Sequence, residues 1–162
     1  MTDHSLLTGK RILVVDDEPD VLETLEDLLP AAAVTTASSF SEARAKLDSE
    51  PFDIAVLDIM GVDGYELLKI AVDKGITSVM LTARALGPDN VKKSFKEGAA
   101  YFIPKEEMAR IDIFLDDILE ARQKGESTWD KWFERMSAYL ERNFQPGWKK
   151  GDEIFWEKFP FH

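Results

Sequence analysis

The sequence predicts an α/β fold: a five-stranded parallel sheet flanked by five helices, followed by a helical C-terminal extension. Short apolar runs recur from Arg11 to Lys105, and each is followed by a segment with apolar residues at helical spacing. Strands and helices that alternate in this way pair in parallel, with right-handed crossovers that place helices on both faces. A change of composition at Gly125 predicts the extension.

The five predicted strands are continuous apolar runs bounded by turn residues, a pattern typical of strands buried on both faces. They span residues 11–15, 33–36, 54–58, 76–81 and 99–103. The second run is the weakest, because it consists of alanine, valine and threonine only.

Helices are predicted over residues 19–29, 39–50, 64–74, 89–97 and 106–124. Pro19 suits the first turn of the first helix, and Pro30 stops it. Ser39 and Glu42 have the spacing of a capping box at the start of the second helix. Gly75 ends the third helix, and the last shows an amphipathic apolar stripe.

Charge and composition exclude several classes of protein. The net charge of −11 argues against binding to nucleic acid or to an anionic membrane surface. The absence of cysteine excludes disulfides, thiolate catalysis and cysteine-bound zinc. We find no run that fits a signal peptide or a membrane span, so we expect a cytoplasmic protein.

Polar side chains follow four of the five predicted strands. They are Asp16 and Asp17, Asp58, Thr82, and Lys105. Because the carboxyl ends of parallel strands share one edge of a sheet, we expect these groups to lie together. Crowded carboxylates repel one another or recruit a cation, and their hard oxygens suit Mg²⁺. The hydroxyl and the ammonium would complete a site for a phosphoryl group, which a carboxylate can itself accept as an aspartyl-phosphate.

Five segments of the sequence, taken in order, resemble the receiver domain of bacterial two-component response regulators. They are Val14-Val15-Asp16-Asp17-Glu18-Pro19, Val56-Leu57-Asp58, Asp63-Gly64-Tyr65-Glu66-Leu67, Leu81-Thr82-Ala83, and Gly98-Ala99-Ala100-Tyr101-Phe102-Ile103-Pro104-Lys105. The resemblance covers a receiver domain over residues 10–124. It implies a flavodoxin-like sheet with strand order 2-1-3-4-5.

The resemblance also implies roles at the predicted site. Asp58 would accept a phosphoryl group from a sensor histidine kinase or a phosphotransfer protein. Asp17 and Asp58 would hold Mg²⁺ together with the backbone carbonyl of Met60, and Asp16 would act mainly through water. Such a protein is not an enzyme, apart from removal of its own phosphoryl group.

By the same resemblance, Thr82 and Phe102 would act as switch residues. Thr82 and Lys105 would grip the phosphoryl oxygens, and Phe102 would be the rotating switch aromatic. The surface that changes would comprise the fourth helix, the fifth strand and the fifth helix. From the residues alone, Thr82 could be an ordinary strand-end hydroxyl and Phe102 an ordinary core aromatic.

The sequence departs from the family pattern at two places. Gly64 follows Asp58 by six residues, so the loop that presents the Met60 carbonyl is about two residues shorter than usual and lacks the usual proline. We expect a metal site that survives in altered form. The family's Lys-Pro pair is Lys105-Glu106 here, and without proline a cis bond is disfavoured.

Residues 125–162 form an aromatic-rich extension. They contain all four tryptophans, five of the ten phenylalanines and a net charge near zero. Trp129, Trp132, Met136 and Leu140 recur at helical spacing, and residues 151–162 form a second short segment. This stripe must be covered by the chain itself, a second copy or a partner. One hypothesis is a homodimer through helix five and the extension. A basic recognition helix is absent from the sequence, which disfavours DNA output.

The leading interpretation is a phosphoacceptor response regulator that signals to an as yet unidentified protein target by protein–protein contact. A degenerate receiver that acts as a phosphorylation-independent interaction module is the alternative, favoured by the short loop. A hydrolase that forms an aspartyl-phosphate ranks last, because no second acid follows Asp58 in an Asp-x-Asp arrangement.

Overall fold

The structure of the protein is a computed structural model that describes residues 6–82 and 88–143. Its sheet contains five parallel strands in the predicted order β2-β1-β3-β4-β5. The strands are β1 (Arg11–Val15), β2 (Ala33–Ala37), β3 (Ile54–Asp58), β4 (Thr77–Thr82) and β5 (Tyr101–Pro104). The fold prediction is therefore confirmed.

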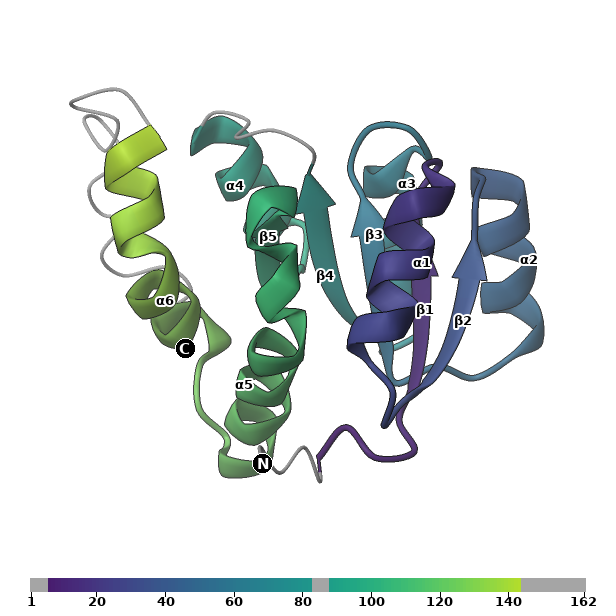
Figure 1. Ribbon diagram of the computed structural model, residues 1–162, viewed down its shortest axis with the longest axis horizontal. Coiled ribbons are helices and arrows are strands. Elements are labelled where there is room, and N and C mark those ends of the chain that lie inside the picture. Colours follow the sequence, from purple (N-terminus) through teal and green to yellow (C-terminus); the bar gives the residue numbers. More distant parts are fainter. Residues whose placement is uncertain (1–5, 83–87, 144–162) are drawn as a thin grey trace.

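Helices cover both faces of the sheet. They are α1 (Pro19–Leu28), α2 (Phe40–Ser49), α3 (Gly64–Asp73), α4 (Pro88–Lys96), α5 (Ile111–Lys124) and α6 (Thr128–Asn143). In Figure 1, α1 and α5 lie in front of the sheet, whereas α2, α3 and α4 lie behind it. This two-sided cover explains why β3 is buried at all five positions and β1 at four of five.

Local signals in the sequence form as expected at several helix ends. Ser39 accepts a hydrogen bond from the Glu42 amide at 3.1 Å, and the Glu42 carboxylate accepts one from the Ser38 amide at 2.7 Å. Gly125 adopts a left-handed conformation with φ 69° and ends α5.

One predicted helix begins later than its apolar pattern suggested. Residues 106–124 read as one helix, but Lys105–Arg110 forms a 3₁₀ segment (η1) and α5 begins at Ile111. A 3₁₀ helix has nearly as many residues per turn as an α-helix, so the spacing of the apolar residues did not distinguish the 3₁₀ segment from the α-helix that follows it.

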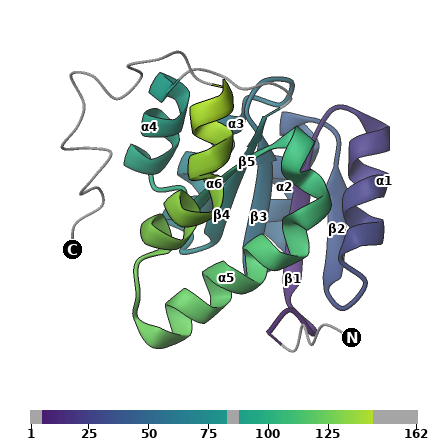
Figure 2. The same ribbon diagram turned by 60° about the vertical axis from the view of Figure 1, so that its left-hand side comes forward.

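The extension folds back onto the sheet rather than continuing α5. In Figure 2, α6 lies in front of β5, between α4 and α5. The edge strand β5 is therefore covered on its open side, which protects backbone groups that a neighbouring strand would otherwise pair. The second predicted segment, residues 151–162, lies outside the described residues. In the described part of the chain, no helix has the length and apolar character needed to cross a membrane.

Candidate phosphoryl-acceptor site

The parallel sheet brings the predicted polar groups to one edge. Asp16 directly follows β1, Asp58 ends β3, Thr82 ends β4, and Lys105 directly follows β5. Asp58 pairs in register with Leu81, the residue before Thr82, and Thr82 pairs with Pro104, the residue before Lys105. The strands therefore deliver these four side chains to adjacent positions, as the sequence predicted.

Lys105 is the cation at the centre of this edge. Its ammonium lies 2.6 Å from Asp16 Oδ2, 3.0 Å from Glu18 Oε1 and 3.7 Å from Asp58 Oδ1. Asp16 has no exposed surface, and Asp58 is 3% exposed. Buried carboxylates need a charged partner, and a single ammonium supplies it for both.

Burial and mutual repulsion shift the ionisation of these groups. Burial raises the pKa of Asp58 to about 6, and the negative charges of Asp16 and Asp17 act in the same direction, whereas Lys105 opposes them. Burial also raises the pKa of Asp16, against the hydrogen bond from Lys105. Burial by itself lowers the pKa of Lys105. The hydrogen bonds from its ammonium to Asp16 and Glu18 have the larger combined effect, so the pKa of Lys105 is raised.

The acids beyond β1 offer the ligands that a hard cation needs. Ligand oxygens of Asp16, Asp17 and Glu18 lie within 4.8 Å of one another, and Asp17 and Glu18 are exposed. Asp16 Oδ1 accepts a hydrogen bond from the Glu18 amide at 2.9 Å, which fixes the carboxylate. The donor set consists of carboxylate oxygens only, so its chemistry fits Mg²⁺. No role was predicted for Glu18, although its place beside two acids in the sequence was a signal.

The short loop after β3 lies directly against the acids. The Met60 carbonyl accepts a hydrogen bond from the Asp63 amide at 3.2 Å, and the Ile59 carbonyl accepts one from Gly64 at 3.1 Å. A Cβ on Gly61 would overlap the Asp17 carboxylate, and one on Gly64 would overlap the Asp58 backbone carbonyl. The loop is therefore a tight turn in which the backbone contact at Gly64 leaves no room for a side chain, whereas a side chain at Gly61 would displace the exposed Asp17 carboxylate.

The Met60 carbonyl retains capacity for a cation. Met60 is 70% exposed, so its side chain is not part of the buried site, and only its backbone carbonyl faces a predicted role there. A carbonyl oxygen has two lone pairs, and the Asp63 amide uses one of them.

The predicted switch residues are both buried. Thr82 is 1% exposed and Phe102 is 3% exposed. Residues 83–87, which follow Thr82, lie outside the described part of the chain. The backbone carbonyl of Phe102 accepts a hydrogen bond from the indole of Trp132 at 2.6 Å. The sequence gave no sign of this contact, which joins residues 30 positions apart.

A family model described as the response regulator receiver domain matches residues 12–114, well over half of the chain. The chain belongs to this receiver family.

Solved receivers share its fold. The receiver domain protein from Methanospirillum hungatei is 28% identical, with a TM-score of 0.65 over 73% of this chain and 99% of the other. The beryllofluoride-activated receiver domain of DrrB is 25% identical, with a TM-score of 0.62 over 70% of this chain and 99% of the other. Receivers of two-component systems bind Mg²⁺ at an acidic cluster, and the acids beyond β1 form such a cluster here.

Curated relatives of the receiver are longer proteins. A probable transcriptional regulator, ycf27 of Guillardia theta, is 34% identical over 70% of this chain and 48% of its own length. The DNA-binding response regulator MtrA of Mycolicibacterium smegmatis is 33% identical over 63% of this chain and 49% of its own length. The chain spans about half or less of the curated relatives it matches.

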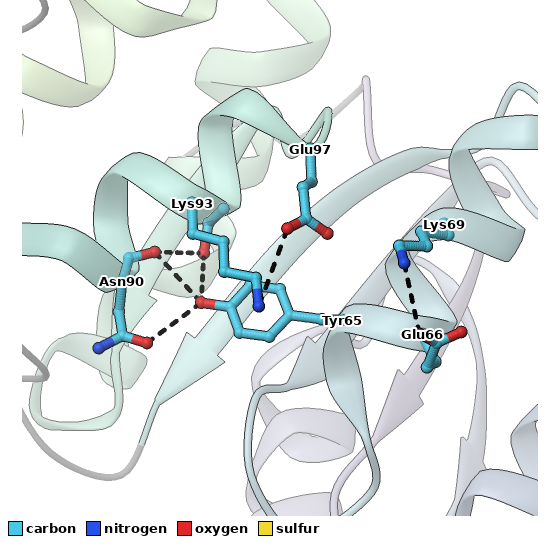
Figure 3. Close-up of polar contacts among 7 residues, drawn as sticks. Tyr65, Glu66, Lys69, Asn90, Lys93 and Glu97 are labelled. Atoms are coloured by element: carbon cyan, nitrogen blue, oxygen red, sulfur yellow. Dashed lines mark hydrogen bonds and ion pairs between the residues drawn. The ribbon is translucent and has the colours of Figure 1, made fainter.

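The Tyr65 side chain joins two helices of the receiver. The Tyr65 hydroxyl lies 3.2 Å from the Asn90 carbonyl and 3.4 Å from Ser94 Oγ, so α3 is bonded to α4 (Figure 3). The Lys93 ammonium lies 4.2 Å from the centre of the Tyr65 ring and 3.9 Å from Glu97 Oε2. Burial raises the pKa of Tyr65, so the phenol remains a hydrogen-bond donor.

Proposed function

We propose that Asp58 accepts a phosphoryl group from a histidine kinase or a phosphotransfer protein. The observation that carries this proposal is the pairing of the buried Asp58 carboxylate with the Lys105 ammonium, 3.7 Å away at the carboxyl edge of the sheet. An Asp58 oxygen forms the bond to phosphorus. The bond from phosphorus to the donor imidazole breaks, and its electron pair and a proton go to the imidazole nitrogen.

The surrounding residues would stabilise the transferred group. Lys105 would shift toward the new phosphoryl oxygens, and Thr82 would donate its hydroxyl to them. Asp16, Asp17 and Asp58, with the Met60 carbonyl, would hold Mg²⁺, which when bound neutralises charge on the phosphoryl oxygens. The protein would not turn over substrates, apart from hydrolysis of its own aspartyl-phosphate.

The output we propose is contact with a protein rather than with DNA. The net charge of −11 opposes the counterion release that drives binding to DNA. We treat residues 10–124 as the receiver and residues 125–162 as its extension. The apolar stripe of α6 packs within the chain, with Trp129, Trp132 and Met136 buried, and a homodimer through helix five and the extension stays a prediction.

Binding of beryllofluoride in the presence of Mg²⁺ tests the proposed site. We expect bound resonances in fluorine NMR for the wild type and for Asp73→Asn, a variant at an exposed acid. Asp58→Asn should lose them. Absence of bound resonances in the wild type at millimolar Mg²⁺ would refute a phosphoacceptor role.

The second candidate is a receiver that acts as an interaction module without phosphorylation. It is favoured by the short loop, in which the Met60 carbonyl already accepts a hydrogen bond from Asp63. A protein of this kind would bind its target with equal affinity whether or not Asp58 is replaced by asparagine, and it would give no response to beryllofluoride.

A further inference from the structure

The α6 helix occupies a defined surface of the receiver, formed by α4, β5 and α5, which we call the α4–β5–α5 face (Figure 2). Five side chains of α6 are buried against the rest of the chain. They are Trp129, Trp132, Met136, Tyr139 and Leu140, each at most 5% exposed. An apolar stripe of this length is a large hydrophobic contribution to docking.

Contacts with all three elements fix α6 on this face. On α4, the Phe95 ring meets Trp129 and Trp132 edge-on, with centroids 4.9 and 5.0 Å apart. On α5, Asp117 accepts two hydrogen bonds from Arg135, at 2.7 and 3.2 Å. A bidentate pair of this kind sets the orientation of a helix as well as its position.

The contacts near β5 lie on either side of Lys105. Trp132 donates to the Phe102 carbonyl at 2.6 Å, three positions before Lys105. Tyr139 donates to Glu106 Oε1 at 2.7 Å, one position after it. Residues 102–106 place the Lys105 ammonium between Asp16 and Asp58. The same residues accept the two hydrogen bonds from α6.

A second set of contacts leads from the acceptor loop to the same face. Gly64 packs against the Asp58 backbone, and the next residue, Tyr65, bonds to Ser94 of α4 (Figure 3). Phe95, the residue after Ser94, carries the contacts with the tryptophans of α6. Both α4 and β5 therefore connect Asp58 to the docked helix.

The docked arrangement also contains an unfavourable group. The Tyr101 hydroxyl is buried and has no hydrogen-bond partner among residues 6–82 and 88–143. Burial raises the pKa of Tyr101, as does the nearby Asp117 of α5, whereas Arg135 of α6 opposes them, so the buried phenol is uncharged. A buried hydroxyl without a partner destabilises the state that buries it, so docking of α6 is weaker than its apolar contacts suggest.

We propose that the α4–β5–α5 face is a helix-binding surface, that α6 occupies it while Asp58 is unmodified, and that phosphorylation of Asp58 releases α6. The proposal rests on the function proposed above. A phosphoryl group adds negative charge beside Asp58 and draws the Lys105 ammonium away from Asp16 and Glu18. Lys105 lies between the residues that bond to Trp132 and Tyr139, so a displacement of this segment toward the phosphoryl group would lengthen or break those bonds.

Release is a shift between two states, so the coupling is reciprocal. The factor by which a bound phosphoryl mimic weakens α6 docking equals the factor by which docking weakens binding of the mimic, so a change that weakens docking raises the affinity for the mimic by up to the same factor. The liberated face would then be open to a target helix that presents aromatic residues and a basic residue at the spacing of Trp132 and Arg135.

The test uses the full chain, Mg²⁺ and beryllofluoride, with hydrogen exchange as the readout for α6 and fluorine NMR as the readout for binding. We expect hydrogen exchange at the α6 amides to become at least about fivefold faster when beryllofluoride binds. This factor is the lower end of typical couplings between two sites. All four tryptophans lie beyond Gly125, so their emission should shift to longer wavelength at the same concentrations. Unchanged or increased protection of α6 in the bound state would overturn the proposal.

A conservative variant tests the reciprocal effect without risk to the fold. Tyr139→Phe removes one hydroxyl, and it should bind beryllofluoride at least about fivefold more tightly than the wild type if docking opposes binding. Ser137→Ala, at an exposed position of α6, is the matched control and should leave the affinity unchanged. Equal affinity of Tyr139→Phe and the wild type would contradict the coupling. Failure of any chain to bind would instead reject the phosphoacceptor function and this proposal with it.

Discussion

Replacement of Asp58 by asparagine should stabilise the protein at neutral pH in the absence of divalent cations. The folded state holds the Asp58 carboxyl with a pKa of about 6, against an ordinary value of 3.8. A difference of about two pH units corresponds to about 3 kcal/mol of unfavourable free energy when the carboxylate is charged. Asparagine has nearly the same shape and no charge, so Asp58→Asn should raise the free energy of unfolding by up to that amount.

The sign of the pH dependence follows from the raised pKa. Well below the ordinary pKa of 3.8 the carboxyl is protonated in both states and contributes no penalty, and at pH 4 the penalty is still small. As the pH rises, the unfolded chain loses this proton before the folded protein does, so stability falls until the pH has passed the folded pKa of about 6. The gain from Asp58→Asn should therefore be near zero at low pH and complete at pH 7.5.

Urea denaturation with a chelator present, at pH 4 and pH 7.5, measures this difference. Asp73→Asn, at an exposed acid at the end of α3, is the matched control and should change stability by less than about 0.5 kcal/mol at both values. An Asp58→Asn protein that is less stable than the wild type at pH 7.5, or equally stabilised at both values, would refute the reasoning.

Three further substitutions test other parts of the site. Gly61→Ala places a methyl group against the Asp17 carboxylate, so calorimetry should show Mg²⁺ affinity reduced at least about tenfold, whereas Met60→Ala should bind normally. Tyr65→Phe should lower the free energy of unfolding by about 1 kcal/mol, because it removes the hydroxyl that bonds α3 to α4, and an unchanged urea midpoint would contradict this. Trp132→Phe should cost about 2 kcal/mol and loosen α6 in hydrogen exchange; equal protection would show that the indole does not anchor the helix.

The site was predictable because each of its groups follows a short apolar run. Asp58 is the last residue of one strand, and Lys105 directly follows another. The alternation of strands and helices makes these strands parallel, so their carboxyl ends, and with them the two residues, lie at the same edge of the sheet. Neither residue had to be located by a long-range contact.

Other features could not be predicted because they join residues far apart in the sequence. The Lys105–Glu18 bond spans 87 positions. The place of Glu18 beside Asp16 and Asp17 marked it as a candidate ligand, but no local pattern pointed to Lys105 as its partner. The stripe that includes Trp132 predicted a helix with an apolar face, but not which surface it covers. That surface depends on the open edge of β5 and on Asp117 and Glu106, which lie on separate elements.

The most direct test of the account is covalent modification of Asp58. The full chain is incubated with acetyl phosphate and Mg²⁺, and its intact mass and fragment masses are measured, with Asp58→Asn and Asp73→Asn alongside. We predict that one phosphoryl group is added to the wild type and to Asp73→Asn, that it lies on Asp58, and that chelation of Mg²⁺ prevents it. An unmodified wild-type chain, or equal modification of Asp58→Asn, would contradict the account.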